Sequence, residues 1–154
     1  MAEIEIFTDG AASGNPGPGG LGVIMRSGRH VKEFSAGFRY TTNNRMELLS
    51  VILALESLKN PGNTVHIYSD SKYVVDAIEK NWIGGWVRKN WKNVKNPDLW
   101  KRYLAVAVQN SVRFHWIRGH DGHPMNERCD EMAVAARLQE NLPADEWYEK
   151  YGAQ

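Results

Sequence analysis

The stretch Thr41–Leu58, TTNNRMELLSVILALESL, decides the fold, because it predicts a helix that is apolar on nearly every side. Such a helix is buried between other elements, and we expect it to run from about Asn44 to Lys59. One carboxylate, Glu47, lies in the expected first turn. Asn44 and Glu47 have the spacing of a capping-box pair, and an acid in the first turn also complements the helix dipole. Taken alone, this acid is explained by capping.

Three strands are predicted before this helix. Residues 3–8 alternate with the period of two that is typical of a strand, which ends near Asp9. The segment DGAASGNPGPGG then interrupts the chain with glycines and prolines. The runs LGVIMR and HVKEFSAGF flank SGR, which predicts a β-hairpin that turns at Gly28. Together the three strands predict an antiparallel meander.

Strands and helices alternate after it. NPGN ends the buried helix, and the run TVHIYS predicts a strand that ends at Asp70. SKYVVDAIEK and PDLWKRYLAVAVQN predict amphipathic helices, VRFHWI a fifth strand and MNERCDEMAVAARLQ a last helix. The pattern predicts a single α/β domain over residues 1–154, with helices packed on one sheet. We expect the acidic tail, about residues 140–154, to be loose.

The composition fits this prediction and excludes several classes of protein. The chain has 154 residues, 42% of them hydrophobic, which suffices for one buried core. Its net charge of +1 gives no argument for or against nucleic acid or a membrane. The single cysteine, Cys129, cannot form an internal disulfide, and the N-terminus lacks the pattern of a signal peptide. No apolar run approaches the roughly 18 residues of a spanning helix. We therefore expect a cytoplasmic protein with no role at a membrane.

Two acids stand at the ends of predicted strands. Asp9 ends the first strand and Asp70 the fourth, and ligands of open α/β sheets gather outside the carboxyl ends of parallel strands. The helical crossover between them allows these strands to be parallel neighbours. With Glu47 nearby, the carboxylates would repel one another unless a proton or a cation lay between them. Such hard oxygen ligands suit Mg²⁺, so the sequence predicts metal-assisted phosphate chemistry.

Each acid also has a simpler explanation. Asp70, in YSDSKYV, is placed to cap the next helix, and Asp9 before a glycine suits a turn. Asp130 is explained as a solvated acid on a helix. The separate explanations do not account for two acids that end strands on either side of one crossover.

Four motifs carry a family resemblance: FTDGAASGNPGPGGLG, TTNNRMELL, YSDSKYV and RGHDGHPMNERCDEMA. In this order, from about Glu3 to Leu138, they resemble the bacterial type 1 ribonuclease H family. The resemblance implies a mixed five-stranded sheet of order 3-2-1-4-5, with strand 2 antiparallel and helices on both faces. It also implies an endonuclease that hydrolyses the RNA strand of RNA·DNA hybrids and leaves 5′-phosphate and 3′-hydroxyl ends.

The resemblance implies the catalytic residues as well. Four carboxylates would bind two Mg²⁺ ions, with Mn²⁺ as an alternative ion: Asp9, Glu47, Asp70 and Asp130. Paired ions activate the attacking water and stabilise the leaving 3′ oxygen in such reactions. His120, in the loop RGHDGHP, is the expected catalytic histidine, acting in proton handling or product release. For His123 a structural role at the start of the last helix is the better explanation, and for Cys129 a buried apolar one.

A basic segment, about residues 80–96, is expected to hold the hybrid. Residues 80–102 carry seven basic side chains and one acid, a charge of +6, while the rest of the chain totals −5. Lysine and arginine bind phosphates without sequence preference. The resemblance, to a longer segment in the family, implies these contacts: Trp82, Trp86, Arg88, Lys89, Lys92 and Lys95. The alternative is that the tryptophans pack a small helix onto the body and the lysines are ordinary solvated surface.

Short amides are suited to reading the 2′-hydroxyl that distinguishes RNA from DNA. By resemblance Asn15, Asn43 and Asn44 contact the minor groove, and Thr42 belongs to a phosphate pocket. The structural alternatives are a turn-forming Asn15 before proline and a helix-capping Asn44.

Three other functions stay open. One is a related nuclease or integrase-like domain that cuts DNA, and another is an inactive hybrid-binding module, against which the four acids argue. The third is a receiver-type phosphoacceptor domain, whose wholly parallel sheet disagrees with the expected hairpin. We expect a monomer with no obligate protein partner.

Overall fold

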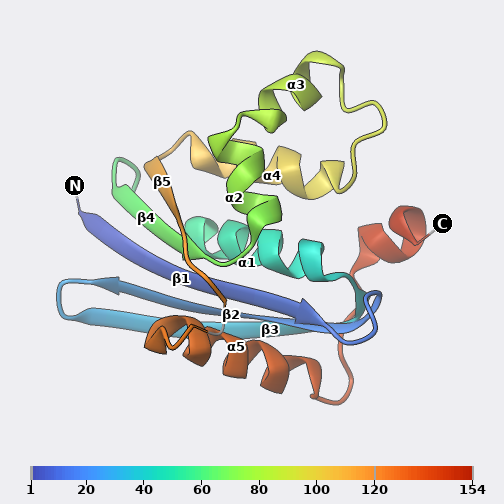
Figure 1. Cartoon of the computed structure of the whole chain (residues 1–154), viewed down its shortest axis with the longest axis horizontal. Coiled ribbons are helices and arrows are strands. Elements are labelled where there is room, and N and C mark those ends of the chain that lie inside the picture. Colours follow the sequence, from blue (N-terminus) through green and yellow to red (C-terminus); the bar gives the residue numbers. More distant parts are fainter. Residues whose placement is uncertain (1, 120, 154) are drawn as a thin grey trace.

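The computed structural model describes residues 2–119 and 121–153, and its centre is a mixed five-stranded sheet (Figure 1). The strands are β1 (Glu3–Ala12), β2 (Gly17–Ser27), β3 (His30–Thr41), β4 (Thr64–Ser69) and β5 (Ser111–Trp116). Their order is β3-β2-β1-β4-β5. β2 is antiparallel to both its neighbours, whereas β4 is parallel to β1 and β5. The predicted sheet is therefore confirmed.

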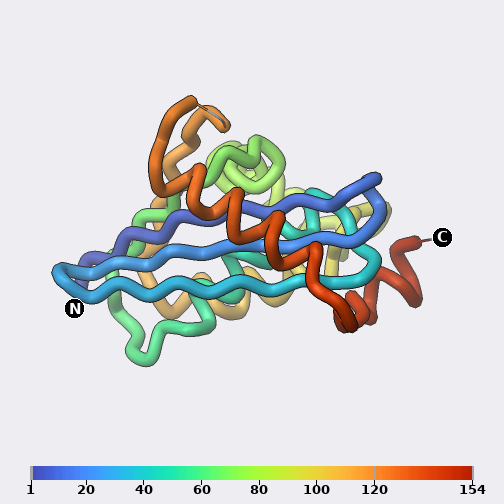
Figure 2. The backbone as a smooth tube through the Cα atoms, turned by 90° about the horizontal axis from the view of Figure 1, so that it is seen from below, coloured from blue at the N-terminus to red at the C-terminus, as the bar shows by residue number. Residues whose placement is uncertain are grey.

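Helices cover both faces of the sheet. They are α1 (Asn43–Glu56), α2 (Lys72–Glu79), α3 (Trp82–Arg88), α4 (Pro97–Ala107) and α5 (Pro124–Arg137). α1 packs on β1 and β2 and against α4, while α5 alone crosses β1, β2 and β3 on the opposite face (Figure 2). None of the helices in the two described ranges is long and apolar enough to cross a membrane.

The larger hydrophobic core lies between α1 and the sheet. Leu48, Ile52 and Leu55 of α1 are buried together with Ile6 and Ile67 from the central strands. The helix is buried on nearly every side, as its sequence predicts, because α4 covers the side that the sheet leaves open. On the other face α5 approaches β2 so closely that a Cβ on Gly22 would lie 2.5 Å from the carbonyl oxygen of Cys129.

The start of α1 differs from the prediction. The N-cap is Thr42, whose Oγ1 accepts a hydrogen bond from the Arg45 amide at 3.2 Å. Asn44 is thus inside the helix, and Glu47 lies in the second turn, beyond reach of a capping box. The capping explanation of Glu47 is wrong, because Thr42, two residues before the expected cap Asn44, is the N-cap.

The C-terminal segment, expected to be loose, is packed against the body. Asp145 is 8% exposed and accepts hydrogen bonds from Thr41 Oγ1 and Arg45 Nε, both at 2.7 Å. Tyr148 is buried at the start of a short π-helix, η1 (Tyr148–Gly152). Sequence spacing misses this packing because Arg45 lies 100 positions before its partner.

Candidate active site

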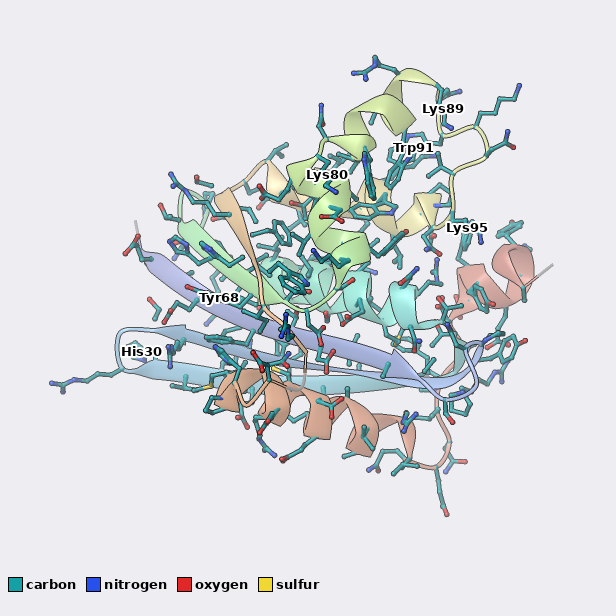
Figure 3. All side chains as sticks on the ribbon, viewed as in Figure 1. His30, Tyr68, Lys80, Lys89, Trp91 and Lys95 are labelled. Atoms are coloured by element: carbon teal, nitrogen blue, oxygen red, sulfur yellow. The ribbon has the colours of Figure 1, made fainter. Side chains whose placement is uncertain are left out.

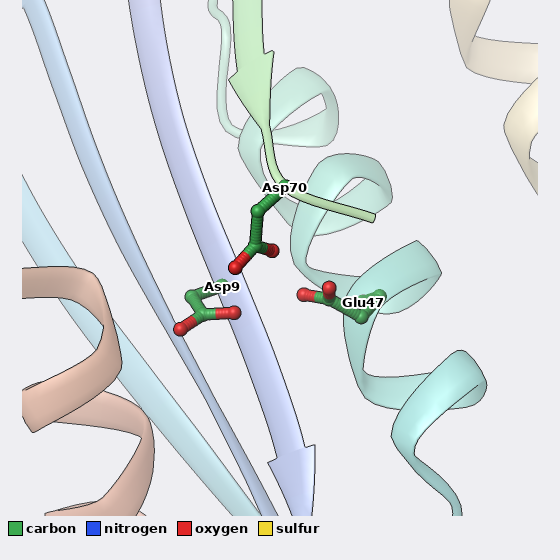
Figure 4. Close-up of side chains that lie close together, drawn as sticks. All are labelled: Asp9, Glu47 and Asp70. Atoms are coloured by element: carbon green, nitrogen blue, oxygen red, sulfur yellow. The ribbon is translucent and has the colours of Figure 1, made fainter. Parts of the chain in front are cut away.

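Three carboxylates converge at one edge of the sheet. Asp9 comes from β1, Asp70 from the loop after β4 and Glu47 from α1 (Figure 4). One oxygen from each lies within 4.8 Å of the others. The sequence therefore predicts correctly that acids at two strand ends and on the buried helix share a site.

The sheet register brings the two aspartates together. β1 and β4 are parallel neighbours, and Phe7 lies opposite Tyr68. Asp9 and Asp70 each follow two residues later, so the two acids lie at the same side of the sheet. β1 continues to Ala12, and Asp9 pairs with Gly22 inside the sheet rather than forming a turn. The turn explanation of Asp9 is therefore wrong.

Asp70 is held by the loops around it and does not cap α2. That role belongs to Ser71, whose Oγ accepts from the amide of Val74 at 3.2 Å. The indole of Trp116 donates to the Asp70 carbonyl oxygen at 3.2 Å. Gly119 backs the carboxylate so closely that a Cβ there would lie 2.6 Å from Oδ2 of Asp70. These contacts leave the carboxylate directed at its two acidic neighbours.

A glycine lets α1 bring its acid to the strand. A Cβ on Gly10 would overlap the backbone of Met46 and Glu47, so only glycine permits this approach. The Oε1 atom of Glu47 is buried and has no hydrogen-bond partner among the residues that the structure describes. A buried carboxylate oxygen without a partner is unfavourable, which indicates a missing cation or proton.

Burial and charge repulsion raise the pKa values of two acids of this cluster, Asp9 and Glu47. Burial, and then the charge of Asp70, raises the pKa of Asp9 from 3.8 to about 7, although the Gly10 amide donates to Asp9 Oδ1 at 2.9 Å. Burial, followed by the charges of Asp9 and Asp70, raises the pKa of Glu47 well above its ordinary value. Asp9 and Glu47 thus resist ionisation beside the charge of Asp70 in the absence of a cation.

A fourth acid faces the same cavity. Asp130, on α5, lines a cavity of about 340 Å³ together with the three carboxylates, and its charge adds to the raised pKa of Asp9. It lies outside the tight three-acid group. Asn43 and Asn44 also line this cavity. Four acids and two amides therefore line one open space at the sheet edge, the candidate catalytic cavity, called the catalytic cavity below.

Comparison with known proteins gives this arrangement a family. The RNase H family matches residues 1–137. The chain belongs to the ribonuclease H family. A ribonuclease H from Desulforamulus reducens is 56% identical over 150 residues, which cover 94% of each chain. The resemblance inferred from the four motifs is confirmed, and with it the prediction of a hydrolytic ribonuclease.

Solved ribonuclease H structures share the fold. LC9-RNase H1, a type 1 RNase H with the type 2 active-site motif, superposes with a TM-score of 0.80 at 29% identity, covering 100% of this chain and 82% of that one. LC11-RNase H1 in complex with an RNA/DNA hybrid gives a TM-score of 0.60 at 28% identity over 86% of this chain and 95% of that one.

The residues predicted to contact the minor groove lie close together in the structure. Asn15 Oδ1 accepts from the amide of Asn43 at 2.9 Å, and the Asn43 side chain accepts from the amide of Ala12. Asn43 and Asn44 line the catalytic cavity, whereas Asn15 and Thr42 line the cavity beside it. The amide of Asn15 thus positions a neighbouring residue as well as being available to a ligand.

The basic segment stands away from the sheet on α3 and the loop that follows it. Figure 3 shows Lys89, Trp91 and Lys95 spread along this protruding loop. All four predicted cations are exposed: Arg88, Lys89, Lys92 and Lys95. Trp82 is 45% exposed, but Trp86 packs against Trp100 with ring centroids 5.4 Å apart. The structural alternative therefore holds for Trp86, whose ring contributes to packing.

The predictions for His123 and Cys129 can be compared with the structure, whereas that for His120 cannot. His120, the predicted catalytic histidine, lies outside the described residues. His123 has the expected structural role, because it is the N-cap of α5 and its ring lies 5.6 Å from that of Phe7. Cys129 is buried as predicted, and burial raises its pKa to about 12, so the thiol is inert.

Two cavity residues were missed by sequence reasoning. Lys72 and Tyr73 follow Asp70 closely and line the catalytic cavity. The Lys72 ammonium lies 4.2 Å from the centre of the Trp116 ring, and the Tyr73 hydroxyl accepts from the indole of Trp100 at 2.8 Å. Their position directly after a candidate ligand, at the start of a helix, was the signal that would have found them.

Metal-free protein is expected to lose stability as the pH rises. The pKa of Asp9 is higher in the folded state, about 7 against 3.8, so between these values the folded state binds more protons than the unfolded state. The free energy of unfolding therefore falls as pH increases through this window. Urea unfolding in EDTA from pH 4.5 to 8 should show a loss on the order of 2–4 kcal/mol from Asp9, and Asp9→Asn should reduce the loss to the part that Glu47 contributes. Equal pH dependence in both proteins would contradict it.

Proposed function

We propose that this chain is an endonuclease that hydrolyses the RNA strand of RNA·DNA hybrids and leaves 5′-phosphate and 3′-hydroxyl ends. The observation that carries the proposal is the cluster of Asp9, Glu47 and Asp70, in which one buried carboxylate oxygen has no partner within the described residues. Family membership supplies the reaction class. A hybrid bound to LC11-RNase H1 supports the same substrate class here.

The acids fit two divalent ions. Their ligand atoms are all carboxylate oxygens, the donors that Mg²⁺ prefers, and the raised pKa values of Asp9 and Glu47 support a bound cation. Asp9, Glu47 and Asp70 would hold one ion, and Asp130 would help to hold the second. When bound, the ions supply charge for the attacking water and the leaving oxygen. Mg²⁺ is the proposed ion and Mn²⁺ its substitute.

The remaining residues bind and orient the substrate. The amides of Asn43 and Asn44 face the catalytic cavity, where they both donate to and accept from the 2′-hydroxyl of RNA, and Asn15 supports them. Thr42 contributes to the adjacent phosphate pocket. Phosphates of the hybrid are held by Arg88, Lys89, Lys92 and Lys95, with Trp82 against a sugar. His120 handles a proton or helps the product to leave. We propose a cytoplasmic monomer.

The fold removes one of the alternative functions. A receiver domain has a wholly parallel sheet, whereas β1, β2 and β3 form an antiparallel meander. The alternative of a DNA-cutting nuclease differs from the proposal in its substrate, so an assay must separate them.

A strand-labelled assay tests the proposal. RNA·DNA, RNA·RNA and DNA·DNA duplexes of one sequence, each labelled on either strand, are incubated with the protein and Mg²⁺. We expect internal cleavage of the RNA strand of the hybrid alone, because only that duplex combines a 2′-hydroxyl at the amides with a deoxyribose strand. Cleavage of duplex DNA, or no cleavage of the hybrid, would sink the proposal.

A further inference from the structure

A second cavity lies beside the catalytic one. It has a volume of about 610 Å³ and is lined by the turn after β1, the start of α1, the end of the protruding loop and the C-terminal segment. Asn44 lines both cavities, so the two lie next to each other. Figure 1 shows the C-terminal segment beside the β1–β2 turn and below the protruding loop. A strand that leaves the acids in this direction would reach the C-terminal segment.

One aromatic ring of this cavity, that of Trp147, is held by a buried ion-pair network. Trp147 lies over the guanidinium of Arg45 at 5.0 Å, and that guanidinium is held by Asp145 and Asp98. The ring of Tyr151 lies 5.8 Å from that of Trp147 and is 56% exposed. An exposed ring on a pre-positioned segment binds a ligand with little loss of conformational entropy.

The lining has the chemistry of a sugar–phosphate site. Among the described residues that line this cavity, Lys95 is the only charged one and none is a carboxylate, whereas four acids line the catalytic cavity. A cation next to aromatic rings suits a phosphate followed by the apolar side of a sugar. Asn44, a proposed contact of the RNA 2′-hydroxyl in the minor groove, lies between the acids and these rings, because it lines both cavities. A hybrid with its RNA strand at the acids and its minor groove over Asn44 therefore brings the DNA strand to the rings.

We propose that Tyr151 and Trp147 contact a deoxyribose of the DNA strand, and that Lys95 holds the neighbouring phosphate. The proposal rests on the proposed function, because it requires the RNA strand of a hybrid at the acids. It assigns the C-terminal segment a part in substrate binding in addition to its packing against the body.

The test measures how tightly a catalytically impaired variant binds a labelled hybrid. In an Asp70→Asn background, Tyr151→Ala is expected to raise the Kd for the hybrid roughly three- to tenfold. This change corresponds to about 25–55 Å² of apolar surface that the variant no longer buries on binding. Tyr151→Phe, which keeps the ring, should restore the affinity. The salt dependence should be unchanged in Tyr151→Ala but should flatten by about 0.7–0.9 per log unit in Lys95→Gln, which removes one phosphate contact. Leu138→Ala, an exposed apolar residue after α5, is the control.

A photoreactive benzoylphenylalanine at position 151 identifies the strand. We expect the adduct on the DNA strand of the hybrid, with the unfolding midpoint of Tyr151→Ala unchanged. An adduct on the RNA strand, no adduct, or wild-type affinity in Tyr151→Ala would each overturn the proposal. If the wild-type protein cleaves hybrids and Tyr151→Ala binds normally, only this inference fails. If wild-type protein does not cleave hybrids, the proposed function fails first.

Discussion

Asp70→Asn is expected to lower the kcat/KM for hybrid cleavage by about 10³-fold, equivalent to roughly 4 kcal/mol of transition-state stabilisation. The substitution keeps the shape of the side chain, so Gly119 and Trp116 still pack around it. It removes one negative charge and one hard oxygen ligand from the three-acid group. Asp9→Asn should have a comparable effect, because Asp9 lines the same cavity and is close enough to Asp70 and Asp130 for both charges to raise its pKa.

Asp76→Asn is the matched control for the loss of charge. Asp76 lies on the next helix, α2, where its carboxylate pairs with Lys80 at 3.7 Å, and it does not line the catalytic cavity. We expect its kcat/KM to stay within about twofold of wild type. Hybrid binding by Asp70→Asn should be retained, since the basic segment is unchanged. Cleavage by Asp70→Asn at a tenth of the wild-type rate or more would show that this carboxylate is not a metal ligand.

The two aspartates of the site could be predicted from the sequence because strand ends are local features. Alternation of side chains marks the strand before Asp9, a β-branched run marks the strand before Asp70, and one helical crossover makes the strands parallel. Glu47 could not be separated from a capping acid by spacing alone. Its role depends on a cap at Thr42 and on the close approach that Gly10 permits, which are contacts between elements.

Other parts of the site depend on contacts that no local pattern encodes. Asp130 reaches the cavity from α5, on the opposite face of the sheet, and only the family resemblance indicated it. The packed C-terminal segment was missed for the same reason. Its composition is acidic and polar, but one of its acids, Asp145, finds a buried cation on α1. The acidic composition of this segment predicts that it is solvated, but the ion pair with Arg45 buries Asp145.

Arg45→Met is expected to lower the free energy of unfolding by about 3–5 kcal/mol, or the melting temperature by about 6–20 °C. Arg45 is 1% exposed, and its guanidinium donates to Asp98 at 2.8 and 2.9 Å and to Asp145 at 2.7 and 3.0 Å. Burial alone would lower its pKa, but the hydrogen bonds to Asp98 and Asp145 raise it above its ordinary value. Methionine fills similar space but leaves two neighbouring carboxylates without their counterion.

Arg102→Met is the matched comparison, because Arg102 makes an equally bidentate pair with Glu56, at 2.6 and 2.7 Å, on the surface. There water replaces the lost contacts, so the expected change is below about 1 kcal/mol. Adding Asp98→Asn and Asp145→Asn to Arg45→Met should recover most of the lost stability, since it removes the unpaired charges. Urea unfolding of the four proteins separates the two contributions. If Arg45→Met is no less stable than Arg102→Met, the buried arginine does not hold the C-terminal segment to α1 and α4.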